Sequence, residues 1–125
     1  MSNVEKVLVG PDWTIRRLIQ CVEGNACGIA LVVDGERRLL ATVTDGDIRR
    51  AVLQGLHLEA SIQELLARKE PAPTITDGPI TAQAGTDEVV LLELMRRHWV
   101  RHVPLLDGDR RVVGLSRIED LVESP

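Results

Sequence analysis

The residues best suited to hold a ligand are Thr44, Asp45 and Asp47, in a short polar stretch that directly follows an apolar segment. If a strand ends here and a helix begins, the turn offers backbone N–H groups, a hydroxyl and the positive end of a helix dipole. Such groups suit a phosphate or a sugar hydroxyl. Asp47, in the first turn of that helix, can accept two hydrogen bonds from a ribose diol. The stretch therefore predicts a site for a small phosphorylated or sugar-containing ligand.

The same residues also have a purely structural interpretation. Thr44 and Asp45 are suited to cap the N-terminus of the helix. Asp47 can cap the helix or pair with Arg50, three residues further on. The sequence leaves the binding and the structural interpretations both open.

Catalytic and metal sites have little support. Asp45 and Asp47 alternate as metal ligands can, but no further oxygen donors follow at calcium-loop spacing. Cys21 and Cys27 lack the second pair that would complete a zinc site. No Ser–His–Asp or Cys–His set is evident. We therefore expect no metal, no catalytic residue and no required cofactor, and a chain that is not an enzyme by itself.

A repeated unit must position the candidate site. Segment 34–41, DGERRLLA, reads nearly letter for letter as segment 107–114, DGDRRVVG, so the offset is 107 − 34 = 73 residues. The same offset carries Asp47 onto Asp120. Neither unit is long enough to bury its own apolar face, so we expect the two units to pack on each other.

Each unit predicts a helix, a strand, a hairpin, a returning strand and a second helix. Thr14 and Asp87 are the expected N-caps of the first helices. Gly35 and Gly108 are expected to supply a positive φ in the hairpin turns. The predicted strands span Ile29–Val33 and Arg38–Val43 in the first unit, and Val103–Leu106 and Arg111–Leu115 in the second.

The second helices are expected to begin near Asp45 and Ile118, with acidic residues in their first turns. A further helical stretch is predicted over Ser61–Lys69. An irregular connector should follow, because this part of the chain contains Pro71, Pro73, Asp77-Gly78 and Pro79.

The repeat resembles the CBS (cystathionine β-synthase) domain. The residues that carry the resemblance are an apolar strand ending in Asp, then Thr44 with Asp47 in the first unit, and the matching segment up to Asp120 in the second. The resemblance implies an α/β fold, a tandem CBS-domain pair of two β-α-β-β-α repeats with pseudo-twofold symmetry. The repeats would span residues 1–70 and 71–125.

The resemblance also implies that each ligand site is shared between the repeats. The first site would combine Thr44, Asp45 and Asp47 with residues of the second repeat: Ile80, Thr81, Val100, Arg101 and His102. Arg101 would bind phosphate oxygens and His102 would add a donor, while Ile80 and Val100 would sandwich a base. The second site would use Asp120, but Arg117 stands where Thr or Ser is usual, and Gly28 and Ile29 supply no charge. We therefore expect one occupied site.

The stretch from Thr44 to Arg50 is similar to CBS pairs attached to sugar-phosphate nucleotidyltransferases and arabinose-5-phosphate isomerases. The resemblance implies a regulatory module for an adenine nucleotide such as AMP or ATP, controlling an attached or partner sugar-handling enzyme. It also implies a homodimer, whose face Ile48, Val52, Leu53, Leu121 and Val122 are expected to supply. A ligand-free dimerisation scaffold and a sensor of a sugar nucleotide are the alternatives.

Composition limits the partners. The formal net charge is −4, which argues against a nucleic-acid partner. No apolar run approaches the ~20 residues of a membrane span, so we expect no membrane partner. The first residues lack the charged start and apolar middle of a signal peptide, so we expect a cytoplasmic location.

Overall fold

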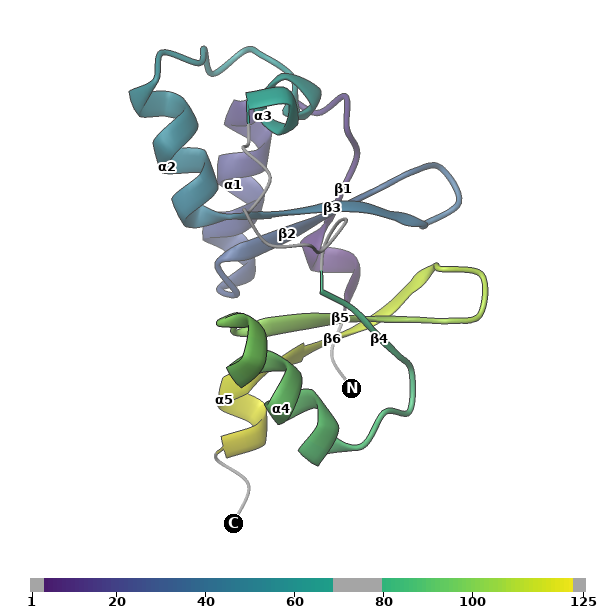
Figure 1. The fold of residues 1–125 in the computed structure, drawn as a ribbon. Helices are drawn as coiled ribbons and strands as arrows, with labels where there is room; N and C mark the ends of the chain where they lie inside the picture. The colour runs from purple at the N-terminus through teal and green to yellow at the C-terminus, as the bar shows by residue number, and fades with distance from the viewer. Residues whose placement is uncertain (1–3, 69–79, 123–125) are drawn as a thin grey trace.

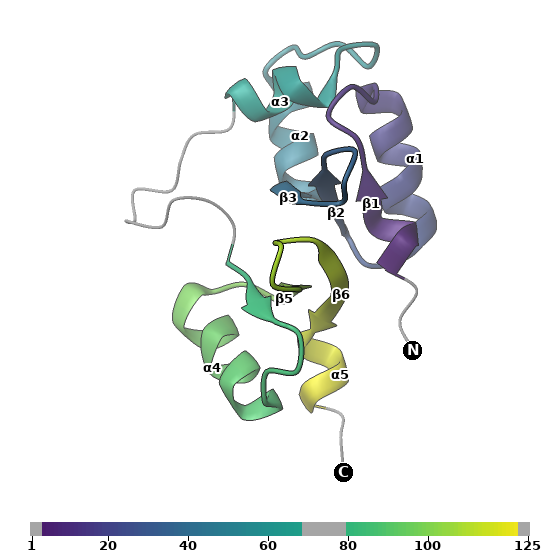
Figure 2. The same cartoon turned by 90° about the vertical axis from the view of Figure 1, so that its right-hand side faces the viewer.

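The computed structural model describes residues 4–68 and 80–122. Two three-stranded sheets lie face to face, and helices cover the outer face of each sheet (Figures 1 and 2). The first repeat contains a 3-10 helix η1 (Val4–Val7), β1 (Leu8–Val9), α1 (Ile15–Asn25), β2 (Ile29–Val33), β3 (Leu39–Thr44), α2 (Asp45–Leu53) and α3 (Ile62–Arg68). The second contains β4 (Ala82–Gln83), α4 (Glu88–His98), β5 (His102–Leu106), β6 (Val112–Arg117) and α5 (Ile118–Val122).

The two sheets have the same topology. Their strand orders are β1-β2-β3 and β4-β5-β6. In each sheet the short first strand runs parallel to the central strand, and the central strand pairs antiparallel with the last. Each repeat is thus the predicted β-α-β-β-α unit, which confirms the fold class. The predicted strand Ile29–Val33 matches β2, and the other three predicted strands have bounds that differ by one or two residues.

The buried apolar side chains form three layers: one under the helices of each repeat and one between the two sheets. The central strand β2 is buried along its whole length because it lies between two of these layers. Side chains alternate between the faces of a strand. Ala30 and Val32 point toward α1, α2 and α3, whereas Leu31 and its neighbours on the other face meet the second repeat. The layer between the sheets joins Leu31 and Leu39 to Leu106 and Val112. The repeats therefore pack on each other as expected.

The predicted helix boundaries hold where the structure describes them. The Thr14 side chain accepts a hydrogen bond from the Arg17 N–H at 3.1 Å, and the Asp87 side chain accepts one from the Val89 N–H at 3.5 Å. The helices α2 and α5 begin at Asp45 and Ile118. The third helix lies inside the predicted range, but Lys69 and the Pro-rich connector lie outside the described residues.

The hairpin turns differ from the prediction. The residues with positive φ are Arg37 (φ 68°) and Arg110 (φ 67°), so the assignment of positive φ to Gly35 and Gly108 was wrong. The Asp at the start of each turn explains the shift. Asp34 Oδ1 accepts from the backbone N–H groups two and four residues on, at 2.8 and 2.9 Å, and Asp107 does the same in the second repeat. These bonds lower the pKa of both carboxyls.

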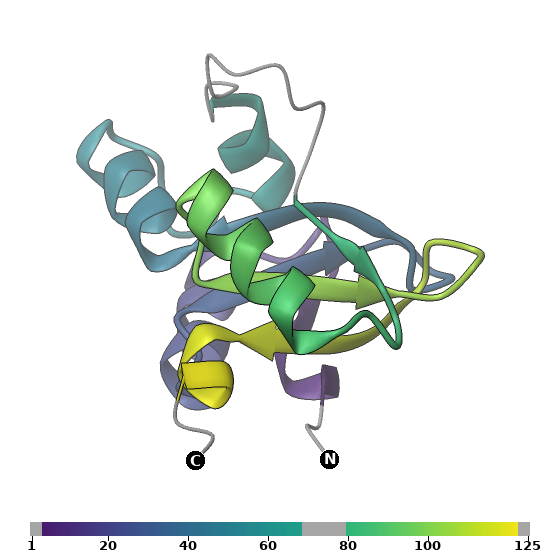
Figure 3. The same ribbon diagram turned by 60° about the horizontal axis from the view of Figure 1, so that its bottom comes forward.

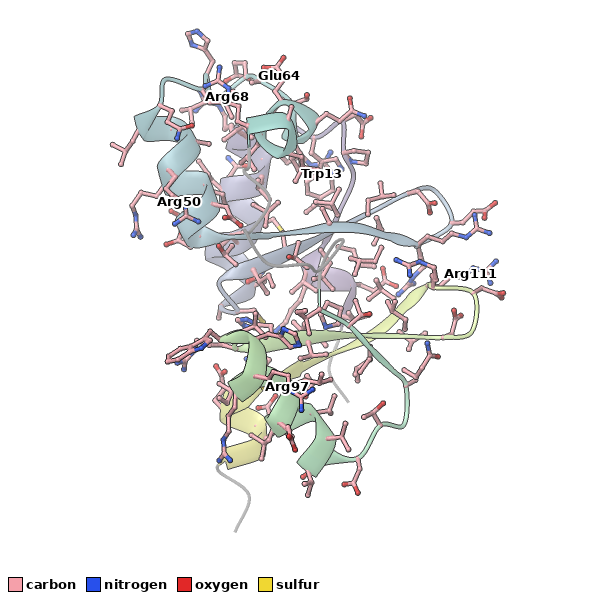
Figure 4. All side chains as sticks on the ribbon, in the orientation of Figure 1. Trp13, Arg50, Glu64, Arg68, Arg97 and Arg111 are labelled. Carbon is pink, nitrogen blue, oxygen red and sulfur yellow. The ribbon has the colours of Figure 1, made fainter. Side chains whose placement is uncertain are left out.

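The two hairpins also hold the repeats together at one end of the molecule. The Leu39 N–H donates to the Arg110 carbonyl at 3.2 Å, and the Val112 N–H donates to the Arg37 carbonyl at 2.9 Å. Both hairpins extend to the same side (Figures 1 and 3), where Arg111 is labelled in Figure 4. At the opposite end of the sheets, β3 leads into α2 and β6 leads into α5.

Only part of the predicted dimer face is exposed among the described residues. Val52 is 40% and Leu53 80% exposed on α2. Ile48, however, is buried in the core of the first repeat, and Leu121 packs against the core of the second repeat, beside Leu91 and Met95. For Val122 the structure describes the backbone but not the side chain. Within the described residues, no helix combines the length and hydropathy that a membrane crossing requires.

Candidate functional site

A cavity of about 470 Å³ opens between the repeats, at the end of the sheets away from the hairpins. Both repeats line it. The residues from the first repeat are Cys27, Gly28, Ile29, Thr42, Thr44, Asp45 and Gly46, and those from the second are Ile80, Trp99, Val100, Arg101, His102 and Pro104. The predicted sharing of one site between the repeats therefore agrees with the position of this cavity.

The start of α2 forms one wall of the cavity. Thr44 ends β3 in an extended conformation, and its hydroxyl accepts a hydrogen bond from the Asp47 N–H at 3.2 Å. The Asp47 carboxylate in turn accepts from the Thr44 N–H at 2.9 Å. This reciprocal capping box fixes the turn that carries Asp45 and Gly46 along the cavity. The Asp45 N–H donates to the Gly28 carbonyl at 3.1 Å, which ties the turn to the loop before β2.

Asp47 is held within the helix turn. Its side chain is only 11% exposed, and its Oδ1 accepts from Arg50 Nη2 at 2.7 Å. Arg50, labelled in Figure 4, comes from the next turn of α2. Both structural roles considered for Asp47, the cap and the pair with Arg50, are therefore present. Asp47 does not line the cavity, and its contact with a ribose stays a prediction.

The second repeat supplies a cation and an imidazole. Arg101 is exposed at the cavity, and within residues 4–68 and 80–122 no carboxylate is recorded within ion-pair distance of its guanidinium. Its carbonyl accepts from the Ile118 N–H at 2.9 Å, which fixes the loop before β5. A guanidinium at the wall of a cavity can bind a phosphate through two parallel hydrogen bonds.

His102 lies beside Arg101 and is half-buried. Burial lowers the pKa of the imidazole below its ordinary value, and the positive charges of Arg117 and Arg101 act in the same direction. A hydrogen bond to the backbone of Cys27 and the charge of Glu119 oppose these effects. The lowered pKa favours the neutral imidazole, and an anion placed beside it would favour its charged form.

The equivalent turn in the second repeat is closed by an ion pair. Arg117 occupies the position that Thr44 has in the first repeat, since 44 + 73 = 117. Its Nε and Nη2 each donate to one oxygen of Asp120 at 3.0 Å. This fork lowers the pKa of the Asp120 carboxyl and raises the pKa of the guanidinium. The Arg117 side chain also reaches to 3.9 Å from the Cys27 sulfur, across the boundary between the repeats.

Most of the predicted site residues meet at this cavity. Those that line it are Thr44, Asp45, Ile80, Val100, Arg101 and His102, whereas Asp47, Thr81 and Asp120 do not. Gly28 and Ile29, expected at the second site, line this cavity instead. Sequence reasoning did not select Cys27, Thr42, Gly46, Trp99 or Pro104, which also line the cavity. Their position depends on tertiary packing, although Trp99 stands only two residues before Arg101 in the chain.

The described part of the chain contains no cluster of three His, Cys, Asp or Glu side chains that could hold a metal ion. The polar groups at the cavity are the hydroxyls of Thr42 and Thr44, the imidazole of His102, the guanidinium of Arg101 and the first turn of a helix with its Asp45 carboxylate, which accepts from Arg49 Nη2 at 2.8 Å. These groups fit an anionic organic ligand.

The comparisons with known proteins define the class. The model of the CBS domain family matches residues 2–54 and 74–124, so the chain belongs to the CBS domain family and contains two copies of the domain.

The most informative relatives are solved CBS proteins. One is the CBS domain protein PAE2072 from Pyrobaculum aerophilum complexed with AMP, at 28% identity, with a TM-score of 0.78 over 99% of this chain and 92% of that chain. Another is the CBS-domain protein ATU1752 from Agrobacterium tumefaciens, at 25% identity and a TM-score of 0.73 over 94% and 81%. Among curated sequences, inosine-5'-monophosphate dehydrogenase of Mycobacterium bovis is 30% identical over 96% of this chain and 20% of its own length. The chain spans about a third or less of such curated relatives, for example 33% of an uncharacterized Helicobacter pylori protein.

Proposed function

We propose that this chain is a regulatory module that binds one adenine nucleotide, such as AMP, in the cavity between its repeats. The observation that carries the proposal is the meeting of Arg101, without a carboxylate partner among the described residues, with the capped turn at Thr44 across one cavity. A phosphate would bind Arg101 and His102, and sugar hydroxyls would meet the Thr44 turn. The AMP complex of the Pyrobaculum relative supports this choice of ligand.

The remaining candidate residues have more specific places in the proposal. Ile80 and Val100 offer apolar contact to the base. Asp47 keeps the Thr44 turn in shape, and its proposed contact with the ribose would require the carboxylate to turn from the Arg50 guanidinium toward the cavity. Thr81 and Asp120 lie outside the lining of the cavity and have no contact in this proposal.

Regulation follows if the nucleotide binds two geometries of the repeats with different affinity. The cavity wall comes from both repeats, so a bound nucleotide would favour the geometry that brings Thr44 and Arg101 to their ligand distances. We propose that this change controls an attached or partner enzyme in the cytoplasm. The resemblance of the Thr44–Arg50 stretch points to a sugar nucleotidyltransferase, and homodimers would form through exposed residues such as Val52 and Leu53.

Calorimetric titration with AMP, ADP and ATP tests the proposal. We expect saturable binding of one nucleotide per chain. Arg101→Gln should weaken it roughly 10- to 100-fold, because hydrogen bonds to charged groups contribute about 1.5–3 kcal/mol. Arg96→Gln, an exposed residue of α4 that does not line this cavity, is the matched control and should bind as the parent does. Equal affinity in the two variants would contradict the proposed phosphate contact.

Two other functions make different predictions in the same titration. The Thr44–Arg50 resemblance favours a sensor of a sugar nucleotide, in which case CMP-, GDP- or UDP-sugars would bind more tightly than AMP. The Arg117–Asp120 fork favours a ligand-free dimerisation scaffold, in which case no nucleotide binds while sedimentation shows a stable dimer.

A further inference from the structure

Trp99 is the most exposed large apolar side chain among the described residues, at 93%. It ends α4 as the C-cap residue and lines the cavity between the repeats. Tryptophan side chains are enriched where proteins meet partners, because the ring offers a large apolar surface and an N–H donor. The position of Trp99 at the cavity makes the nucleotide of the proposed function the first partner to consider.

The backbone at Trp99 shows that the fold does not require a large side chain there. Trp99 has left-handed dihedrals, φ 56° and ψ 41°, which Gly or Asn usually adopts at the end of a helix. The equivalent residue of the first repeat is Ala26, since 99 − 73 = 26, with φ 59° and ψ 14°. Both repeats therefore need the left-handed turn, but Ala satisfies it in one of them. The indole in the second repeat serves a purpose other than ending the helix.

The other tryptophan of the chain is already engaged by the protein. Trp13 packs against the first core, and the guanidinium of Arg17 lies 3.6 Å from its ring centroid. Trp99 packs in none of the three described core clusters, and the cation–π contact recorded for the described residues is that of Trp13. The two faces of the Trp99 ring are thus available for stacking at the mouth of the cavity.

We propose that Trp99 stacks on the base of the bound nucleotide and is the residue by which the cavity distinguishes a nucleotide from a plain sugar phosphate. The proposal rests on the proposed function. Val100 follows Trp99 directly and Arg101 comes next, so one short loop would contact the base and the phosphate of a single ligand. A flat indole suits any nucleobase, because every base presents a π face.

The test combines two ligands with single-tryptophan fluorescence. In a Trp13→Phe background, Trp99 is the only tryptophan of the chain. AMP should quench its fluorescence, whereas ribose 5-phosphate, which has the same phosphate and sugar but no base, should leave it unchanged. By calorimetry, Trp99→Ala should weaken AMP binding roughly 5- to 150-fold, the range reported for base–aromatic stacking, and leave ribose 5-phosphate binding unchanged. Trp99→Phe should retain most of the AMP affinity.

The possible failures can be told apart. If AMP binds the parent and Trp99→Ala equally well, the stacking proposal is overturned while the proposed function stands. The same holds if Trp99→Ala loses AMP and ribose 5-phosphate to the same extent, or if it abolishes only self-association, which would make Trp99 an interface residue. If the parent binds no nucleotide, both proposals are overturned.

Discussion

The two turns that join a strand to a helix, residues 44–47 and 117–120, occupy equivalent places in the repeats but hold their carboxylates in different ways. In the first turn, Thr44 caps the helix and leaves a small hydroxyl at the wall of a cavity. In the second, Arg117 forks onto Asp120 through two bonds of 3.0 Å. Both carboxylates meet a cation of their own repeat, since Asp47 also accepts from Arg50 Nη2 at 2.7 Å. In the second turn, however, the cation stands at the position that the Thr44 hydroxyl has in the first, so the two turns offer different groups to a ligand.

The largest effect is expected when the first turn is given the side chain of the second. In Thr44→Arg, the guanidinium should fork onto Asp47 as Arg117 does onto Asp120 and fill the space of the ligand. Calorimetry should show AMP binding weakened roughly 100-fold or more, since charged hydrogen bonds and the space for the sugar are both lost. Loss of the cap should also cost about 1 kcal/mol of unfolding free energy, measured by denaturant titration.

Thr44→Ser is the control for that substitution, because serine keeps the hydroxyl and caps a helix equally well. It should bind AMP with the affinity of the parent. Parent-like binding by Thr44→Arg would mean that the turn at Thr44 does not contact the ligand.

The converse exchange should create a site. Arg117→Thr removes the fork, returns the pKa of Asp120 toward its ordinary value and opens the space beside Cys27. We expect the calorimetric stoichiometry to rise from one toward two, with a second affinity roughly 10- to 100-fold weaker. The weakness follows from Gly28 and Ile29, which stand in place of Arg101 and His102 and supply no charged hydrogen bond.

Arg111→Thr, an exposed arginine of the hairpin (Figure 4), is the matched control for Arg117→Thr and should keep one site. A stoichiometry of one in both variants would show that the fork is not what closes the second turn.

The sequence predicted the scaffold well because the signals that begin and end its helices and strands occur in both repeats. Both N-caps, the bounds of β2 and the starts of α2 and α5 follow from residue type and spacing. The positive φ moved from glycine to arginine because the Asp side chain closes the turn, a bond that spacing does not reveal. The strands β1 and β4 have two residues each, too few for a periodic pattern.

The site was predicted less completely, for a tertiary reason. Thr44 could be selected from the polar residue types around it, whereas Arg101 was placed at the site by the resemblance to the CBS domain. Trp99 and Pro104 reach the cavity only through the packing of one repeat on the other. The type and position of Asp47 suit both a helix cap and a ligand contact, so the sequence alone does not distinguish these two roles.

The smallest effect concerns pH and His102, which has uncharged Ile29 as its equivalent in the first repeat. Burial lowers the pKa of His102, and a bound phosphate would raise it. The extra affinity from the imidazolium is thus fully present below the pKa of the free protein and is lost as pH rises through the pKa of the complex. AMP affinity measured by calorimetry should fall roughly 5-fold from pH 6 to pH 8, since charging a donor adds about 1 kcal/mol to a hydrogen bond.

His102→Gln should remove that pH dependence and leave only the change due to the nucleotide's own phosphate, whose second pKa is about 6. An identical pH profile in the parent and the variant would show that the imidazole does not meet the phosphate.

A crystal structure of the chain grown with AMP tests the central claim most directly. We expect one nucleotide per chain, between the Thr44 turn and Arg101, with the Arg117–Asp120 fork intact in the equivalent turn of the second repeat. A nucleotide bound beside Asp120, or a cavity at Arg101 that stays without ligand density at saturating AMP, would contradict it.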